Sequence, residues 1–162
     1  MVAKIIEKMV LYFSSDVRRI NHALKVYAFA KTIAGLERIS REELLITELA
    51  AVLHDIGIKE SERKYGSSAA RYQELEGPPV AAELLKAVGA EEEVIQRVCH
   101  LIGNHHTYGK IDGIDFQILV EADFLVNIFE DGMDRNTVMK IREKYFSTNI
   151  GVTLIESMYL KE

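Results

Sequence analysis

Residues 43–57 read ELLITELAAVLHDIG, an apolar stretch that ends in an adjacent histidine and aspartate. Its apolar residues recur three and four positions apart, which is typical of a helix with one buried face: Leu45, Leu49, Val52, Leu53 and Ile56. Ser40 and Glu43 form a capping-box pattern before the stretch, and Gly57 follows it as a stop signal. We therefore predict a helix that begins after Ser40 and ends at the polar pair His54-Asp55.

Helical periodicity continues through most of the chain, and strand-like alternation is rare. We expect further helices at about residues 2–13, 16–35, 77–89, 91–104, 114–129, 134–145 and 148–159. The polar segment 58–76 is predicted to be a loop with one short helix, and Gly77-Pro78-Pro79 to open the next helix. The sequence thus predicts an all-α fold, a single compact bundle of about seven to nine helices spanning residues 1–162.

Composition narrows the choice of partners and compartment. A chain of 162 residues with 48% hydrophobic residues can bury a core without disulfides, and its one cysteine, Cys99, favours a reducing cytoplasm. The net charge of −5 argues against a nucleic-acid polymer as partner. Charged residues interrupt the N-terminal stretch, so neither an export signal nor a membrane partner is expected. Apolar residues near Ile150 and Leu154 could belong to the core or to a homodimer interface.

Asp123 is a carboxylate within a strongly apolar helical segment, residues 118–126. Burying it unpaired would cost several kcal/mol, and residues 114–133 contain no lysine or arginine that could compensate. A metal ion is one candidate partner for this carboxylate. The alternative is that Asp123 faces solvent on a polar stripe shared with Glu121 and Asn127.

Several histidines also lie beside apolar segments. His22 alone fits a hydrogen-bonded core residue as readily as a ligand, and His105-His106 fit the C-terminal end of a helix. His100 is assigned no role. Taken with His54, Asp55 and Asp123, however, these side chains form an N/O donor set that suits one or two divalent transition-metal ions: iron, manganese, cobalt, nickel or zinc.

The order of His22, then His54-Asp55, then Asp123 resembles the HD-domain superfamily of metal-dependent phosphohydrolases. Residues 49–57 are very close to the central motif of that family, and residues 121–125 resemble its closing Ala-Asp segment. The resemblance implies an all-helical enzyme that hydrolyses a phosphate ester of a nucleotide or another small phosphorylated metabolite.

The segments between these motifs resemble one branch more than others. Residues 75–82 and 102–107 are similar to segments of the diadenosine tetraphosphate hydrolase branch, although Glu76 stands where that branch has histidine. The cyclic dinucleotide phosphodiesterase branch fits less well, because residues 107–110 lack its Gly-Tyr-Pro signature.

The resemblance also implies roles for the site residues. One ion would be held by His22, His54 and Asp123, and a second by Glu76, His105 and His106. Asp55 would bridge the two ions and act with them in catalysis, as the metal activates the attacking water. Lys59 is the candidate for an additional electrophile, with a solvated surface lysine as the alternative.

Residues that could bind the substrate phosphate are predicted mainly in the polar segment. They are Lys64, Ser67, Ser68 and Arg71, together with Arg18 one turn before His22, for which a plain surface charge is the alternative. Two other functions stay open: a metal- or nucleotide-binding regulatory module without turnover, and a metal-free helical interaction protein.

Overall fold

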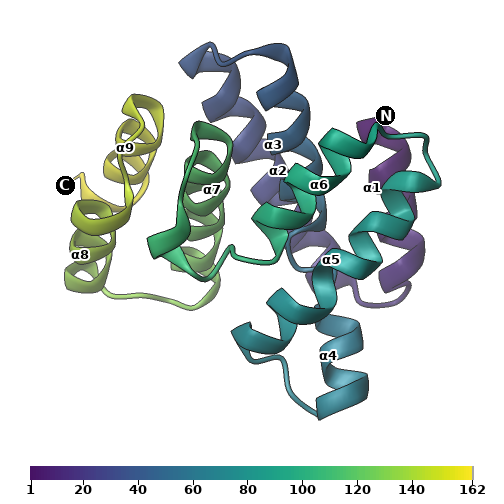
Figure 1. Ribbon diagram of the computed structural model, residues 1–162. Helices are drawn as coiled ribbons and strands as arrows, with labels where there is room; N and C mark the ends of the chain where they lie inside the picture. The colour runs from purple at the N-terminus through teal and green to yellow at the C-terminus, as the bar shows by residue number, and fades with distance from the viewer. Residues whose placement is uncertain (162) are drawn as a thin grey trace.

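The computed structural model describes residues 1–161 and consists of helices joined by short connections, with no strand in that range. The prediction of an all-α fold is confirmed (Figure 1). In chain order the elements are α1 (Val2–Phe13), α2 (Val17–Glu37), α3 (Arg41–Leu53), α4 (Ile58–Tyr65), α5 (Ala70–Lys86), α6 (Glu92–Ile102), the 3-10 turn η1 (Tyr108–Lys110), α7 (Ile114–Glu130), α8 (Arg135–Tyr145), α9 (Asn149–Ile155) and the π-turn η2 (Glu156–Leu160).

Helices α2, α3 and α7 form the centre of the bundle, where α2 packs against both of the others. Small buried residues at their contacts, including Ala23, Ala30, Ala50 and Ala122, let the helices approach closely. Helix α1 covers α3, while α5 and α6 pack against each other on the same side of the molecule. This arrangement brings polar side chains from three central helices into one buried region.

The start of α3 follows the sequence closely. The hydroxyl of Ser40 accepts from the Glu43 N–H at 3.1 Å, and the Glu43 carboxylate accepts from the Ser40 N–H at 2.8 Å. These reciprocal bonds satisfy two N–H groups that a helix start leaves without partners. The helix ends at Leu53 with His54 at its C-cap, so the His-Asp pair emerges from the core end of α3.

The prediction for residues 58–76 is wrong in its boundaries. Residues 58–65 form α4, and α5 begins at Ala70, so Pro78 and Pro79 lie inside a helix that they were expected to open. The segment before α5 is tied to the helix by Gln73, whose Nε2 donates to the Ser68 carbonyl at 2.6 Å. Packing against α4 and α6 then offsets the backbone donors that the prolines lack.

A close backbone approach fixes where α5 crosses the His-Asp turn. A Cβ on Gly57 would lie 2.5 Å from the Gln73 carbonyl and 2.5 Å from the Gly77 nitrogen. A Cβ on Gly77 would lie 2.7 Å from Ile102 of α6. Two glycines are therefore needed for α5 to pass between the turn after Asp55 and helix α6.

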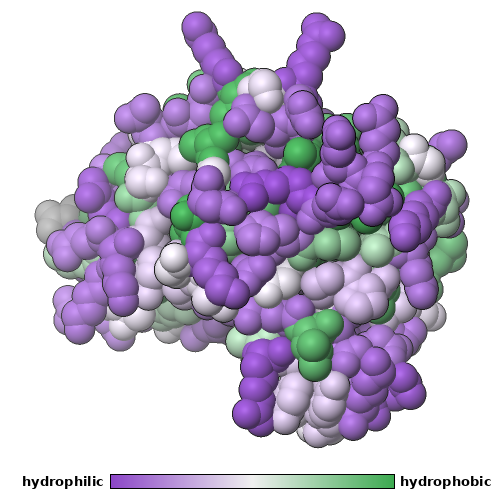
Figure 2. All heavy atoms as spheres, viewed as in Figure 1, coloured by the Kyte–Doolittle hydropathy of each residue, from purple (hydrophilic) through white to green (hydrophobic). Residues whose placement is uncertain are grey.

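Within the described residues, no helix is long and apolar enough to cross a membrane. Hydrophilic residues dominate the face seen in Figure 2, with hydrophobic ones scattered among them. The lobe formed by α4 and the start of α5 projects from the rest of the molecule (Figure 1).

Candidate metal centre

Three helices contribute the first group of candidate ligands. His22 comes from α2, His54 from the end of α3, and Asp123 from the middle of α7. The Nε2 atoms of the two histidines are 3.1 Å apart, and Oδ1 of Asp123 lies 3.3 Å from the first and 3.6 Å from the second. All three residues are buried. The prediction that Asp123 is buried rather than solvent-facing therefore agrees with the structure.

The hydrogen bonds of the imidazoles fix which nitrogen faces the centre. Nδ1 of His54 donates to the Ala51 carbonyl at 2.9 Å, and Nδ1 of His22 donates to Oε2 of Glu130 at 2.9 Å. In their neutral forms both rings therefore turn a lone pair on Nε2 toward the other ring and toward Asp123. These lone pairs and the carboxylate repel one another unless a proton or a metal ion lies among them.

Asp55 connects this group to a second one. Its Oδ2 lies 3.6 Å from Nε2 of His22 and 3.5 Å from Nε2 of His54, while its Oδ1 lies 3.6 Å from Nε2 of His105. Asp55, His105 and His106 offer ligand atoms within 4.8 Å of one another, as do the three residues of the first group. One carboxylate thus presents an oxygen to each group, as a bridging ligand would.

Two buried atoms in the centre have no hydrogen-bond partner, Nε2 of His105 and Oδ1 of Asp123. His105 also donates from Nδ1 to the Ile102 carbonyl at 2.7 Å, so its Nε2 carries a lone pair. Unpaired buried acceptors are costly, and the nearest polar atoms to both of these are themselves lone-pair bearers, the Asp55 carboxylate for His105 and the imidazole Nε2 atoms for Asp123. The donor set therefore fits divalent metal, with one unsatisfied atom in each group.

The charges of the centre reinforce one another. Burial would lower the pKa of His22, but the nearby carboxylates of Asp123, 3.3 Å from its Nε2, and of Asp55 favour the protonated ring and raise that pKa to about 9. Burial likewise opposes ionisation of Asp55 and Asp123, yet the neighbouring histidines hold both carboxyl pKa values below their usual range. The carboxylates therefore stay ionised and attract a cation.

His106 differs from the other histidines. Burial and the adjacent His105 lower its pKa to about 4, so the ring is neutral at physiological pH. A neutral imidazole is the form that binds metal.

A family model described as HD domain matches residues 19–144 of the chain. The chain belongs to the HD domain family. Among solved structures it is similar to a protein described as a predicted HD superfamily hydrolase from an uncultured Thermotogales bacterium. That likeness has a TM-score of 0.70 at 24% identity and covers 98% of this chain and 84% of the other, which supports the fold. No curated protein matches the chain.

In the structure, Glu76 does not lie with the other candidate ligands. Its carboxylate bonds to the Lys64 ammonium and accepts from the Tyr65 hydroxyl at 2.9 Å. Two other residues of α5 contact His106: Oε1 of Gln73 lies 3.4 Å from its ring Nε2, and the Glu74 carboxylate accepts from its backbone N–H at 3.0 Å. The rotation of α5 about its axis, set by the contact between Gly57 and Gly77, turns Glu76 toward α4 instead.

Lys59 is also placed away from the centre of this HD domain. Its ammonium donates to the Tyr12 carbonyl at 2.7 Å and lies over the Tyr12 ring. The backbone carbonyl and the ring at the end of α1 hold the lysine, so the structure does not bring it to His54-Asp55 as the predicted electrophile.

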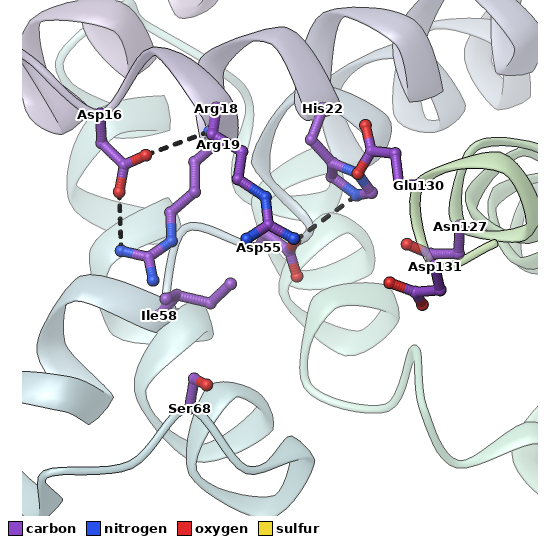
Figure 3. A pocket seen from close by; sticks show the side chains of 10 residues that line it. All are labelled: Asp16, Arg18, Arg19, His22, Asp55, Ile58, Ser68, Asn127, Glu130 and Asp131. Atoms are coloured by element: carbon purple, nitrogen blue, oxygen red, sulfur yellow. Dashed lines mark hydrogen bonds and ion pairs between the residues drawn. The ribbon is translucent and has the colours of Figure 1, made fainter.

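A pocket of about 390 Å³ opens beside His22 and Asp55 (Figure 3). Two of the predicted substrate-binding residues, Arg18 and Ser68, line this pocket. The other three do not: Lys64 is paired with Glu76, Ser67 accepts from the Ala69 N–H, and Arg71 donates to Tyr72. These residues serve the local structure of the α4–α5 lobe.

Sequence reasoning missed Glu130, which orients His22 and is also bonded by Lys25. It lies seven residues after Asp123 on α7, and that spacing places both on one face of a helix. Asn127 and Asp131 of the pocket wall follow Asp123 by four and eight residues and show the same signal.

Proposed function

We propose that this HD domain is a metal-dependent phosphohydrolase that cleaves a phosphate ester of a nucleotide or another small phosphorylated metabolite. The observation that carries the proposal is the pair of ligand groups that share Asp55, each with a buried atom lacking a partner. Structural histidines and carboxylates normally satisfy one another, whereas each of these groups leaves one buried acceptor without a hydrogen-bond partner.

Each side chain has a role that follows from its contacts. His22, His54 and Asp123 would hold one divalent ion, His105 and His106 a second, and Asp55 would contribute an oxygen to each. A divalent ion bound there supplies Lewis-acid chemistry, which acidifies a water molecule and offsets the charge of a phosphate. Iron, manganese, cobalt, nickel and zinc all suit this mixture of imidazole and carboxylate donors.

The residues around the ligands would position the substrate. Arg18 reaches into the pocket from α2 toward Asp55, where a guanidinium can bind two phosphate oxygens at once (Figure 3). Glu130 fixes the ring orientation of His22 through Nδ1, a contact that generally raises the basicity of a ligating histidine. Ile58 and Ser68 bound the pocket on the side of the α4–α5 lobe.

The test is metal stoichiometry combined with turnover. Protein purified without chelator and loaded with manganese should hold about two ions per chain by elemental analysis, one for each group, and release phosphate from a panel of phosphate esters. Asp55→Ala should lose both the second ion and turnover. Asp112→Asn is the matched control, since that exposed aspartate pairs with Arg97 away from the centre.

Glu76→Gln tests whether the second ion is held with Glu76 or by Asp55, His105 and His106 alone. Because Glu76 is held by Lys64 and Tyr65, this variant should keep the stoichiometry of the wild type. Loss of one ion would instead return Glu76 to the ligand set. Stable metal and nucleotide binding without any release of phosphate would contradict the enzyme and favour a regulatory module.

A further inference from the structure

The positive charges near the centre are almost all committed to partners within the protein. Arg19 bonds to Asp16 at 2.8 Å and to Glu62 at 2.6 Å, so it joins α2 to α4. Lys25 is bonded to Glu130. Arg18 lines the pocket and has no ion-pair partner within 4.0 Å among residues 1–161. It is therefore the pocket cation available to a ligand.

The opposite wall of the pocket carries negative charge and hydrogen-bond acceptors. Figure 3 shows Asn127 and Asp131 across the pocket from Arg18, with Asp55 between them. Asp131 is exposed and has no ion-pair partner within the described part of the chain. A carboxylate in this position repels an anion and accepts hydrogen bonds from hydroxyl or ammonium groups.

The charge of the centre itself matches one phosphate. Its neutral imidazoles and two carboxylates, Asp55 and Asp123, would leave a net charge of about +2 with two divalent ions bound. One phosphate dianion neutralises that charge, and Arg18 adds one further contact. Among the described residues that line the pocket, a second or third phosphate of the same ligand would meet Asp131 and no further cation free of an ion pair.

We propose that the substrate carries a single phosphate group and that its remaining part is uncharged or cationic, with hydrogen-bond donors directed at Asn127 and Asp131. This inference rests on the proposed function and specifies its substrate class. It argues against nucleoside polyphosphates and dinucleoside polyphosphates as substrates.

The experiment compares ligands that differ only in phosphate number, with excess manganese throughout. Adenosine mono-, di- and triphosphate form one series, and fructose 6-phosphate against fructose 1,6-bisphosphate forms a second. In the wild type, kcat/KM for the singly phosphorylated member should exceed that of the others by about tenfold or more, as expected for one uncompensated charge contact. Equilibrium binding of adenosine mono- and triphosphate by calorimetry provides a readout independent of turnover.

Asp131→Asn is the decisive variant, because it removes the repelling charge and keeps the shape. The preference for the singly phosphorylated ligand should narrow by about threefold to fivefold in both series. Glu7→Gln removes the same charge from an exposed position on α1 that does not line the pocket, and it should leave the preference unchanged. Ratios measured within one variant cancel differences in folding or metal content.

The possible outcomes distinguish a wrong substrate class from the absence of phosphohydrolase activity. Equal or better turnover of the polyphosphates would overturn the inference while the phosphohydrolase stands. An unchanged ratio in Asp131→Asn would also overturn it. If no phosphate is released from any ligand, the enzyme proposal fails, and tighter binding of the monophosphate than of the triphosphate would then support the same ligand class for a binding module.

Discussion

Glu121 and Asp123 are both buried carboxylates of α7, but their oxygens meet different surroundings. Glu121 accepts from the backbone N–H groups of Ser147 and Thr148 at 2.7 and 2.9 Å, and also from the Thr148 hydroxyl and the Gln117 amide. Asp123 faces imidazole nitrogens, and its Oδ1 has no hydrogen-bond partner. Glu121 holds the C-terminal segment against α7, whereas Asp123 is a candidate metal ligand.

The comparison shows that burial of a carboxylate does not by itself indicate a metal site. Both residues lie in an apolar helix far from lysine and arginine in the sequence, so the argument applied to Asp123 applies equally to Glu121. The alternative of a solvent-facing stripe that includes Glu121 does not hold, because Glu121 is fully buried. What separates the two is whether protein donors satisfy the oxygens, and those donors come from 26 and 27 residues further along the chain.

The largest expected effect comes from Asp123→Asn. Replacing a charged ligand by an amide should lower turnover by about a thousandfold, the scale on which loss of a key electrostatic group acts. The rise in melting temperature on adding manganese should also disappear. If turnover and metal stabilisation both persisted in Asp123→Asn, the contrast with Glu121 would not hold.

Glu121→Gln should act on stability and leave the metal centre alone. Its amide nitrogen would face backbone N–H donors, so the free energy of unfolding should fall by roughly 2–4 kcal/mol. Urea denaturation of the metal-free protein measures this change, and elemental analysis should give the wild-type metal content. Loss of metal with unchanged stability would reverse the roles assigned to the two carboxylates.

Gly151→Ala tests the same contact from the other side. A Cβ at this position would overlap Oε2 of Glu121 and lie 2.7 Å from the Thr148 hydroxyl oxygen. We expect a loss of about 1–3 kcal/mol in the free energy of unfolding, typical of overpacking. Gly35→Ala is the control, because a Cβ there meets nothing within 4 Å and should stabilise α2 by about 0.5–1 kcal/mol.

The smallest effect is expected for Glu130→Gln, which keeps the shape but weakens the partner of His22. Metal affinity should fall by about tenfold, the lower end of the effect of residues that orient a ligand. Competition with a fluorescent chelator would measure this affinity.

The pH dependence of metal affinity tests His22 itself. Because His22 has a pKa of about 9, its proton competes with the metal, so metal affinity should rise as the pH increases toward that value. Affinity independent of pH between 7 and 9 would argue against His22 as a ligand.

The sequence alone determined the helical class, the capping box at Ser40 and Glu43, and the order of His22, His54-Asp55 and Asp123. These features are local or periodic, so neighbouring residues express them directly. The prediction of a loop at residues 58–76 failed because polar composition does not distinguish a loop from a polar helix held by tertiary contacts, such as α4.

Only the tertiary structure decided which side chains face the centre. Whether Gln73 or Glu76 points toward His106 depends on the rotation of α5, which the close contact between Gly57 and Gly77 sets. Whether a buried carboxylate such as Glu121 is satisfied depends on donors from a distant segment. Helical periodicity records that a face is buried but not which atoms lie opposite it, and the chemistry of this HD domain depends on those atoms.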